Sequence, residues 1–369
     1  MKIALITIHK VSNYGALLQA YATKVVLSKY GDVQTIDYNN GYLNNQLNLI
    51  RFKPSAHGFK MLFHDILRLP FHYKLIKRFK LFIHDKMNLT HEVNSEFLNN
   101  GNLKKFDVYV CGSDQIWNPD ILNSNAILDP IFFLSFAPQK AVKFSYASSI
   151  GHYNYNDKEK KVIKQLLQSF KSISTREEDG VVKLKEIAPD REVVHVVDPT
   201  LLLTKQEWLK EFNIKEQIPN EKYLLVYSVP RTELIKKAIH YFSKKLNLKI
   251  VTIDKMLFPI TKVDVHVRNA GPKEYIALFA NASFIVTDSF HGTCFSINFN
   301  KPFVSISIGK KTNRILSLLK ELNLNDRIMY DEKDFDTTDL SINFTEVNPH
   351  LTKIRNQSLN FIHKTLKIN

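Results

Sequence analysis

The sequence has few cysteines and no apolar segment long enough to span a membrane. Its 369 residues include two cysteines, Cys111 and Cys294, and each lies inside an apolar run. This number excludes a disulfide framework and a zinc site, and it fits a reducing cytoplasm. Uninterrupted apolar stretches of about 18 residues do not occur, and residues 2–8 form a predicted strand without a cleavable signal pattern. The sequence therefore predicts neither a membrane-spanning protein nor one exported by a signal peptide.

Acidic residues are also scarce relative to basic ones. The chain has 51 Lys and Arg against 36 Asp and Glu, giving a net charge of +15 and a pI near 9.5. This surplus predicts an anionic partner, either a phosphorylated substrate, a membrane surface or nucleic acid. We expect no nucleic acid, because no recognisable binding motif accompanies the charge. The G-x-G-x-x-G fingerprint is missing after the first strand, so a nucleotide pyrophosphate is not expected there.

Strands alternate with helices in both halves of the chain. The pattern predicts an α/β protein with two Rossmann-like domains facing across a cleft. We expect an N-terminal domain over residues 1–204 and a C-terminal domain over 222–345. A helix within residues 350–369 is expected to pack back across the domains.

A basic, aromatic-rich helical insertion is predicted near residues 41–105 of the N-terminal domain. Within residues 51–86, Lys and Arg greatly outnumber the two acids, Asp65 and Asp85, and alternate with phenylalanines. Such a segment can lie in the interface of an anionic bilayer. An ordinary amphipathic helix whose apolar face joins the core has the same pattern. The sequence leaves both interpretations open.

A strand, a tight turn and a helix are predicted within residues 284–298. The apolar run breaks at Asp288 and Ser289, and helical spacing begins at His291. The first N–H groups of such a helix point to the carboxyl end of the sheet, where open α/β folds bind anions. We expect Gly292 to let a ligand approach the backbone and Thr293 to add a hydroxyl. A capped turn with a surface histidine explains the same residues.

Arg176 is predicted at the carboxyl end of another strand, beside a helix N-terminus that favours acidic residues. A cation at this position suggests a bound anion. The alternative is a salt bridge to Glu177, Glu178 or Asp179, since such pairs are common.

Six segments, taken in order, resemble the polysaccharide pyruvyl transferase family. They are NYGALLQA at 13–20, GSDQIWNP at 112–119, SYASSIG at 145–151, STRE at 174–177, DPT at 198–200 and TDSFHGT at 287–293. The resemblance implies a fold similar to GT-B glycosyltransferases. It also implies a transferase that moves the pyruvyl group of phosphoenolpyruvate onto a sugar of a surface polysaccharide or its lipid-linked precursor.

In this resemblance Arg176 matches the family's donor-binding arginine and His291 matches its functionally important histidine, and these are the two expected catalytic residues. Some members carry Arg-Leu-His where this chain has Ser289, Phe290 and His291, so one donor-binding cation is missing. Lys310, Lys311 or Arg314 could replace it. The full set expected to bind the donor is Arg176, Ser289, Phe290, His291, Gly292, Thr293, Lys311 and Arg314.

The C-terminal domain is the expected donor side, and the N-terminal domain is the expected acceptor side. Five side chains of the N-terminal domain are expected to bind the acceptor sugar. They are Asn13, Tyr14, Asp114, Gln115 and Trp117, and the indole of Trp117 could stack on a pyranose ring, although most tryptophans are core residues. Phosphoenolpyruvate is expected as a co-substrate, with no cofactor and no metal. The expected location is the cytoplasm, at the inner face of the cytoplasmic membrane if the basic insertion contacts anionic lipid.

Ketal formation needs a group that moves protons near neutral pH, and His291 is the best placed residue. Proton transfer to the donor and assistance to the phosphate leaving group both remain open for this histidine. Two other functions remain as alternatives, because fold does not fix chemistry. One is a GT-B glycosyltransferase that uses a nucleotide sugar, and the other is a catalytically silent polysaccharide-assembly protein.

Overall fold

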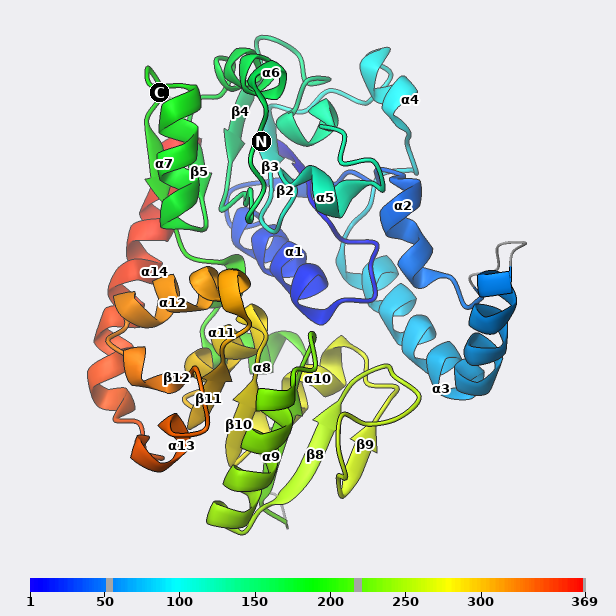
Figure 1. The fold of residues 1–369 in the computed structure, drawn as a ribbon. Helices are drawn as coiled ribbons and strands as arrows, with labels where there is room; N and C mark the ends of the chain where they lie inside the picture. Colours follow the sequence, from blue (N-terminus) through cyan, green and yellow to red (C-terminus); the bar gives the residue numbers. More distant parts are fainter. Residues whose placement is uncertain (51–55, 216–220, 368–369) are drawn as a thin grey trace. The chain divides into compact units, whose positions relative to one another are not determined.

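The computed structural model describes the chain except for residues 51–55, 216–220 and 368–369 and the side chains of residues 56–65, 310 and 311. The chain divides into two compact units (Figure 1). Unit 1 comprises Met1–Leu47, Leu81–Leu202 and Thr352–Asn369, and unit 2 comprises Asn48–Lys80 and Leu203–Leu351.

Unit 1 is built on parallel strands. A four-stranded sheet has the order β2-β1-β3-β4, and β5 pairs with β6. Single bridges from Phe144 to Ser172 and from Ser148 to Thr175 connect β4 to β5. The strands are β1 (Lys2–Ile6), β2 (Asp32–Thr35), β3 (Val108–Cys111), β4 (Val142–Ser145), β5 (Ile173–Thr175) and β6 (Val193–His195). Strand β3 is buried along its whole length, as its continuous apolar sequence predicts for a central parallel strand.

Most helices of unit 1 begin after an asparagine whose side chain caps them. Asn13 accepts a hydrogen bond from the N–H of Ala16 at the start of α1, and Asn156 and Glu159 form a capping box on α6. The helices are α1 (Tyr14–Leu27), α2 (Gly41–Asn44), α4 (Ser95–Asn99), α5 (Pro119–Leu122), α6 (Asp157–Leu167) and α7 (Glu178–Ile187), with 3₁₀ turns η1 (Asn45–Leu47), η2 (Pro130–Phe133) and η3 (Pro199–Leu201).

The described part of unit 2 contains a six-stranded parallel sheet. Its order is β12-β11-β10-β7-β8-β9, so the chain changes direction across the sheet between β7 and β10. The strands are β7 (Tyr223–Tyr227), β8 (Lys249–Ile253), β9 (Val265–Val267), β10 (Phe284–Thr287), β11 (Phe303–Ile306) and β12 (Ile328–Met329).

Helices of unit 2 pack on this sheet and share its apolar core. Ile235, Ala238, Ile239 and Phe242 of α9 join Val286 in one buried cluster. The helices are α8 (Lys205–Glu211), α9 (Glu233–Leu246), α10 (Pro272–Asn281), α11 (Phe290–Asn298), α12 (Asn313–Glu321) and α13 (Asp334–Thr337), with 3₁₀ turns η4 (Gly309–Thr312) and η5 (Asn325–Arg327).

Two long helices pass from one unit to the other along the chain. Helix α3 (Ala56–Lys86) belongs to unit 2 up to Lys80, and α14 (Phe344–Leu366) belongs to unit 1 from Thr352. The assignment of the whole insertion near 41–105 to the N-terminal domain is therefore corrected. Arg78 of α3 donates a 2.6 Å hydrogen bond to the carbonyl of Asn269, which helps explain why this part of α3 groups with unit 2.

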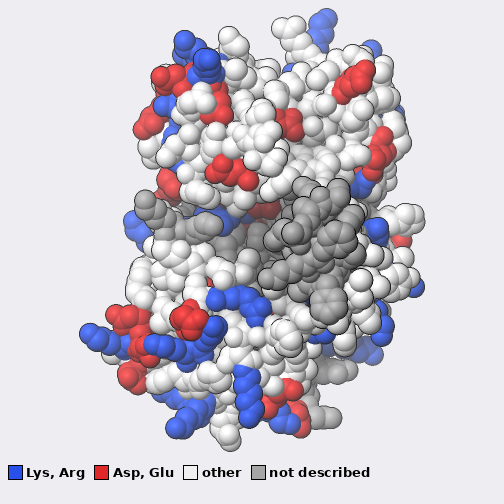
Figure 2. Space-filling model, turned by 45° about the vertical axis from the view of Figure 1, so that its right-hand side comes forward, with Lys and Arg blue, Asp and Glu red and all other residues white. Residues whose placement is uncertain are grey.

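The surface charge and the hydropathy of the helices bear on possible contact with a membrane. On the face shown in Figure 2, Lys and Arg side chains are interspersed with Asp and Glu. Among the described helices, none combines the length and apolar composition needed to cross a lipid bilayer.

Candidate functional site

The six family-like segments follow parallel strands of the two units. Five of them begin within three residues of the carboxyl end of a strand, namely β3, β4, β5, β6 and β10. The remaining segment, residues 13–20, caps and begins helix α1 after the loop that follows β1. Ligands of open α/β sheets bind outside these ends, above all where the strand order reverses. The reversal lies between β1 and β3 in unit 1 and between β7 and β10 in unit 2.

Hydrogen bonds join the loops at the reversal point of unit 1. The hydroxyl of Thr7 donates to the carbonyl of Ser113 at 3.0 Å, and the amide of Gln19 donates to the Thr7 hydroxyl at 3.1 Å. Asp114 follows with a φ of 70°, a left-handed conformation that is uncommon outside glycine. These contacts fix the start of the loop that carries the predicted acceptor-binding residues.

Arg176 lies in a buried cluster of carboxylates in unit 1. Its Nε donates to Glu177 Oε1 at 3.0 Å, its Nη1 donates to Asp198 Oδ2 at 2.8 Å, and its Nη2 lies 3.7 Å from Asp114 Oδ1. The arginine side chain is 1% exposed, whereas that of Asp114 is 13% exposed. Burial alone lowers the pKa of Arg176, but the three carboxylates raise it above its ordinary value, so the guanidinium stays charged.

This geometry agrees with the salt-bridge interpretation of Arg176. Three carboxylates surround one guanidinium, so the local charge is acidic rather than basic. Because the arginine side chain is 1% exposed, a phosphorylated donor does not reach it in this conformation. The sequence did not identify Asp198 as a partner, although its position directly after β6 was a usable signal.

The other predicted acceptor residues differ in exposure. Trp117 is fully buried, stacks on Phe133 and donates its indole N–H to the carbonyl of Phe132 at 3.0 Å. Its predicted stacking on a sugar is therefore wrong. Gln115 is partly exposed and accepts from Asn118 at 2.8 Å, Asn13 is exposed while capping α1, and Tyr14 is buried.

A histidine near the same edge was missed at the sequence level. The Nδ1 of His9 lies 3.0 Å from the carbonyl of Thr7, and its Nε2 lies 3.4 Å from Oδ1 of Asp37. Because the carbonyl can only accept, Nδ1 carries the proton. Lys10 contacts Asp37 at 2.6 Å; burial raises the pKa of Asp37, but His9 and Lys10 lower it overall. The sequence feature that could have identified His9 is its position in the loop directly following strand β1.

Asp288 organises the reversal point of unit 2. It accepts hydrogen bonds from the Ser228 hydroxyl at 2.6 Å and from the N–H of Val229 at 2.8 Å. Burial raises the pKa of Asp288, and these hydrogen bonds act in the opposite direction. The loop after β7 and the turn after β10 are thereby held together.

The start of α11 differs in detail from the prediction. The Ser289 hydroxyl accepts from the N–H of Gly292 at 3.4 Å, and the N–H of Thr293 donates to the Ser289 carbonyl at 2.9 Å. These two N–H groups serve the helix itself rather than a ligand. The hydroxyl of Thr293 is buried against Ser305 at 2.8 Å, so it is not offered to a ligand either.

Gly292 is required by packing rather than by ligand approach. A Cβ atom there would lie 2.2 Å from Thr287 Oγ1 and 3.2 Å from Tyr227 Cδ1. The predicted roles of Gly292 and Thr293 as direct donor contacts are therefore corrected. Both residues set the position of α11 on β10.

His291 and Phe290 form the first turn of α11 and are mostly buried. Their rings meet edge to face at 5.3 Å, and the guanidinium of Arg314 lies 5.6 Å from the centre of the Phe290 ring. Arg314 therefore places a cation near the segment in which the resemblance led us to expect one. The side chain of Lys311 lies outside the described residues.

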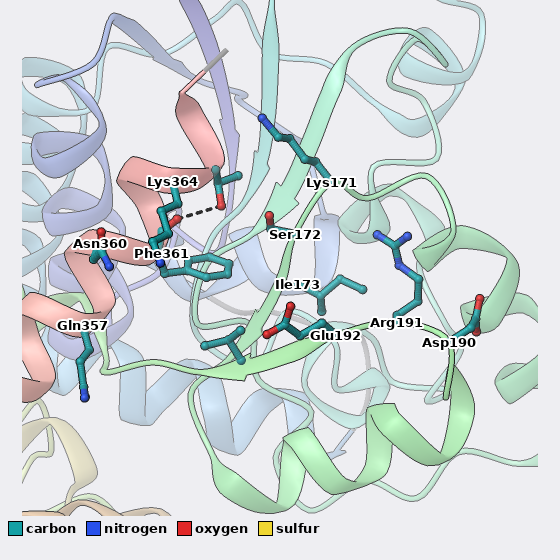
Figure 3. A pocket seen from close by; sticks show the side chains of 12 residues that line it. Lys171, Ser172, Ile173, Asp190, Arg191, Glu192, Gln357, Asn360, Phe361 and Lys364 are labelled. Atoms are coloured by element: carbon teal, nitrogen blue, oxygen red, sulfur yellow. Dashed lines mark hydrogen bonds between the residues drawn. The ribbon is translucent and has the colours of Figure 1, made fainter. Parts of the chain in front are cut away.

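A pocket lies at the amino-terminal ends of β5 and β6, at the opposite end of these strands from Arg176 (Figure 3). Its volume is about 510 Å³. The residues lining it are Lys171, Ser172, Ile173, Asp190, Arg191, Glu192, Val194, Gln357, Asn360, Phe361, Lys364 and Thr365. None of the predicted site residues lines this pocket.

The fold belongs to the α/β class, with two Rossmann-like units as in GT-B enzymes. A Listeria monocytogenes structure described as a UDP-N-acetylglucosamine 2-epimerase is similar, with a TM-score of 0.51, 8% identity, and coverage of 99% of this chain and 95% of that chain. The UDP-GlcNAc 2-epimerase of Neisseria meningitidis bound to UDP-GlcNAc has a TM-score of 0.49 and 14% identity, with 100% of both chains covered. At 8% identity, the similarity to the Listeria protein concerns the fold alone.

The family follows from a separate comparison. The profile of the family described as polysaccharide pyruvyl transferase matches residues 13–310, and the chain belongs to this family. A comparison with curated protein sequences gave no significant match.

Proposed function

We propose that the protein transfers the pyruvyl group of phosphoenolpyruvate to two hydroxyl groups of one sugar, forming a ketal and releasing phosphate. The sugar belongs to a surface polysaccharide or to its lipid-linked precursor. Family membership supports a transferase of polysaccharide biosynthesis. The observation that carries the proposal is that five of the six family-like segments begin within three residues of the carboxyl end of a parallel strand, where such folds bind substrates.

In the proposed reaction the donor contacts unit 2. Phosphoenolpyruvate carries a carboxylate and a phosphate, so its binding requires cations and N–H donors. The positive end of the α11 dipole and the guanidinium of Arg314 near Phe290 supply the positive charge. His291, in the first turn of α11, is assigned to proton transfer, either to the donor methylene or to the departing phosphate.

The bonds and protons of the reaction balance without a cofactor. A proton adds to the methylene carbon of the donor, and the first sugar hydroxyl forms a bond to C2 as its own proton leaves. The C2–O bond to phosphate then breaks with both electrons going to phosphate, and the second hydroxyl attacks C2 and loses its proton. One hydroxyl proton replaces the proton consumed at the methylene, and the other neutralises charge on phosphate.

The acceptor is assigned to unit 1. The partly exposed carboxylate of Asp114 can accept a hydroxyl proton or a hydrogen bond from the sugar, and Gln115 and Asn13 add polar groups at the same edge. Arg176 acts as a positioning residue that holds Asp114, Glu177 and Asp198. We place the reaction in the cytoplasm, where the free thiols of Cys111 and Cys294 would stay reduced.

Thermal unfolding with millimolar phosphoenolpyruvate tests the donor, with UDP-sugars as a parallel series. A ligand present at about 100 times its Kd adds roughly 2.7 kcal/mol to the stability of the folded state. We expect stabilisation by phosphoenolpyruvate that is reduced in Arg314→Gln. Stabilisation by UDP-sugars alone would identify a glycosyltransferase, and no stabilisation by either ligand would favour a catalytically silent protein. Turnover close to wild type in His291→Ala would exclude the assigned role of His291.

A further inference from the structure

Helix α3 has two contrasting faces. One face is buried through Leu75, Ile76, Phe79, Phe82 and Ile83, as in an ordinary amphipathic helix. The other face carries large apolar side chains that remain exposed. Ile66 and Leu67 are 50% exposed, Phe71 is 44% exposed and Tyr73 is 52% exposed. Burial of one face therefore does not explain why the exposed face carries large apolar side chains.

A loop of unit 2 extends this exposed apolar surface. The guanidinium of Arg268 lies 4.5 Å from the ring centre of Phe71, and its Nε donates to the carbonyl of Met256 at 3.0 Å. Met256 is 39% exposed and Phe258 is 72% exposed, the highest value among the large apolar residues of the described chain. We call Ile66, Leu67, Phe71, Tyr73, Met256 and Phe258 the α3 surface.

Basic side chains continue the same face of α3 toward its C-terminus. Lys74, Lys77 and Lys80 are exposed and follow Tyr73 at helical spacing. Helix α9 provides a contrast within the same unit, because its exposed positions are the polar residues Glu233, Lys237, His240, Lys244 and Lys245. An exposed helix face of unit 2 therefore does not require large apolar residues.

We propose that the α3 surface binds an anionic membrane. Its apolar side chains enter the boundary between headgroups and acyl chains, and Lys74, Lys77 and Lys80 contact anionic headgroups. Exposed apolar side chains on the same helix as exposed lysines match such an interface, whereas a purely hydrophobic protein partner would leave the three lysines without a complementary charge. The inference rests on the proposed function in one respect, since a lipid-linked acceptor would be presented at this surface.

Vesicle cosedimentation of the full chain tests the inference. The probes are phosphatidylcholine vesicles with and without phosphatidylglycerol. The charge variant is Lys74→Gln with Lys77→Gln and Lys80→Gln, and the apolar variant is Leu67→Ser with Phe258→Ser. The matched controls are Lys158→Gln with Lys161→Gln and Lys164→Gln on α6, and Ile127→Ser, which changes a residue that is 61% exposed.

Wild type is expected to bind vesicles that contain phosphatidylglycerol and to lose binding as salt increases. The charge variant should bind at least about tenfold more weakly, the apolar variant should bind more weakly at any salt concentration, and both controls should bind like wild type. Equal loss in a control, or no binding by wild type, would overturn the inference. A dimer in solution that dissociates in the apolar variant would overturn it in favour of a second copy of the chain.

Two readouts separate this inference from the proposed function. Thermal stabilisation by phosphoenolpyruvate does not require lipid, so it should be equal in wild type and in the charge variant. Failure of vesicle binding with intact donor binding would remove the membrane contact alone. The thermal unfolding curves also establish that both variants are folded.

Discussion

The carboxyl ends of the two sheets have similar architecture and opposite electrostatics. In unit 1, Arg176 is enclosed by Glu177, Asp198 and Asp114, so the edge has more acid than base. In unit 2, the positive end of α11 lies near the guanidinium of Arg314. A motif arginine at a strand end therefore need not bind an anion, because its role depends on the carboxylates that the fold brings to it.

Removing the arginine of unit 1 should have the largest effect. Arg176→Met leaves buried carboxylates without their cation, and breaking such a network costs about 3–5 kcal/mol of unfolding free energy. Arg314→Met in unit 2 should cost far less stability and should weaken phosphoenolpyruvate binding. Urea denaturation and ligand titration measure both quantities. A stable Arg176→Met protein with weakened donor binding would show that Arg176 contacts the donor directly.

Adding one methyl group at the start of α11 should have the next largest effect. Gly292→Ala places Cβ 2.2 Å from Thr287 Oγ1, and overpacking of this kind costs about 1–3 kcal/mol. Gly41→Ala is the control, because a Cβ there has no neighbour within 4 Å. Equal stability of the two variants in urea would contradict the packing role of Gly292.

Substitutions at Ser289, the N-cap of α11, can restore the cation that the resemblance expects at this position. Ser289→Ala and Ser289→Arg both remove the hydroxyl that accepts from Gly292, and each should cost about 1 kcal/mol of stability. The arginine variant alone should bind phosphoenolpyruvate more tightly, by about tenfold, because it adds a charged hydrogen-bond donor. Calorimetric titration with phosphoenolpyruvate measures the affinity of each variant. Equal affinity of the alanine and arginine variants would show that the donor does not bind near position 289.

A pH dependence should report the environment of Asp288. Burial raises its pKa in the folded state, so the folded protein binds more protons than the unfolded one above the ordinary aspartate pKa. The contribution of Asp288 to stability is therefore present at low pH and is lost as pH rises through the raised pKa. Relative to wild type, Asp288→Asn should gain stability over this window, by up to about 1.4 kcal/mol for each pH unit crossed. Parallel profiles in urea would contradict the raised pKa.

The sequence was sufficient to predict the strands and helices that position the site. Residues 284–287 form the predicted strand β10, and the helix after it begins at Phe290, next to the predicted start at His291. Local apolar spacing and turn residues carry this information. The α/β class and the family followed from the same local segments.

Roles that depend on distant partners could not be predicted in this way. Asp198 is 22 residues from Arg176 in the sequence, and the close approach of Gly292 to Tyr227 joins helix α11 to strand β7. The burial of Trp117 depends on Phe133 and Phe132, which belong to a separate 3₁₀ turn. These contacts arise from tertiary packing and leave no periodic signal in the sequence.

Hydrogen exchange of the backbone amides, measured with and without phosphoenolpyruvate, tests the central claim most directly. The account predicts that the donor protects the amides at the start of α11, within residues 288–293, and in the segment before α12, with UDP-sugars giving no protection there. Protection by phosphoenolpyruvate confined to residues 112–118 and 174–178 of unit 1 would contradict the assignment of the donor to unit 2. An absence of protection at saturating phosphoenolpyruvate would contradict the proposed donor itself.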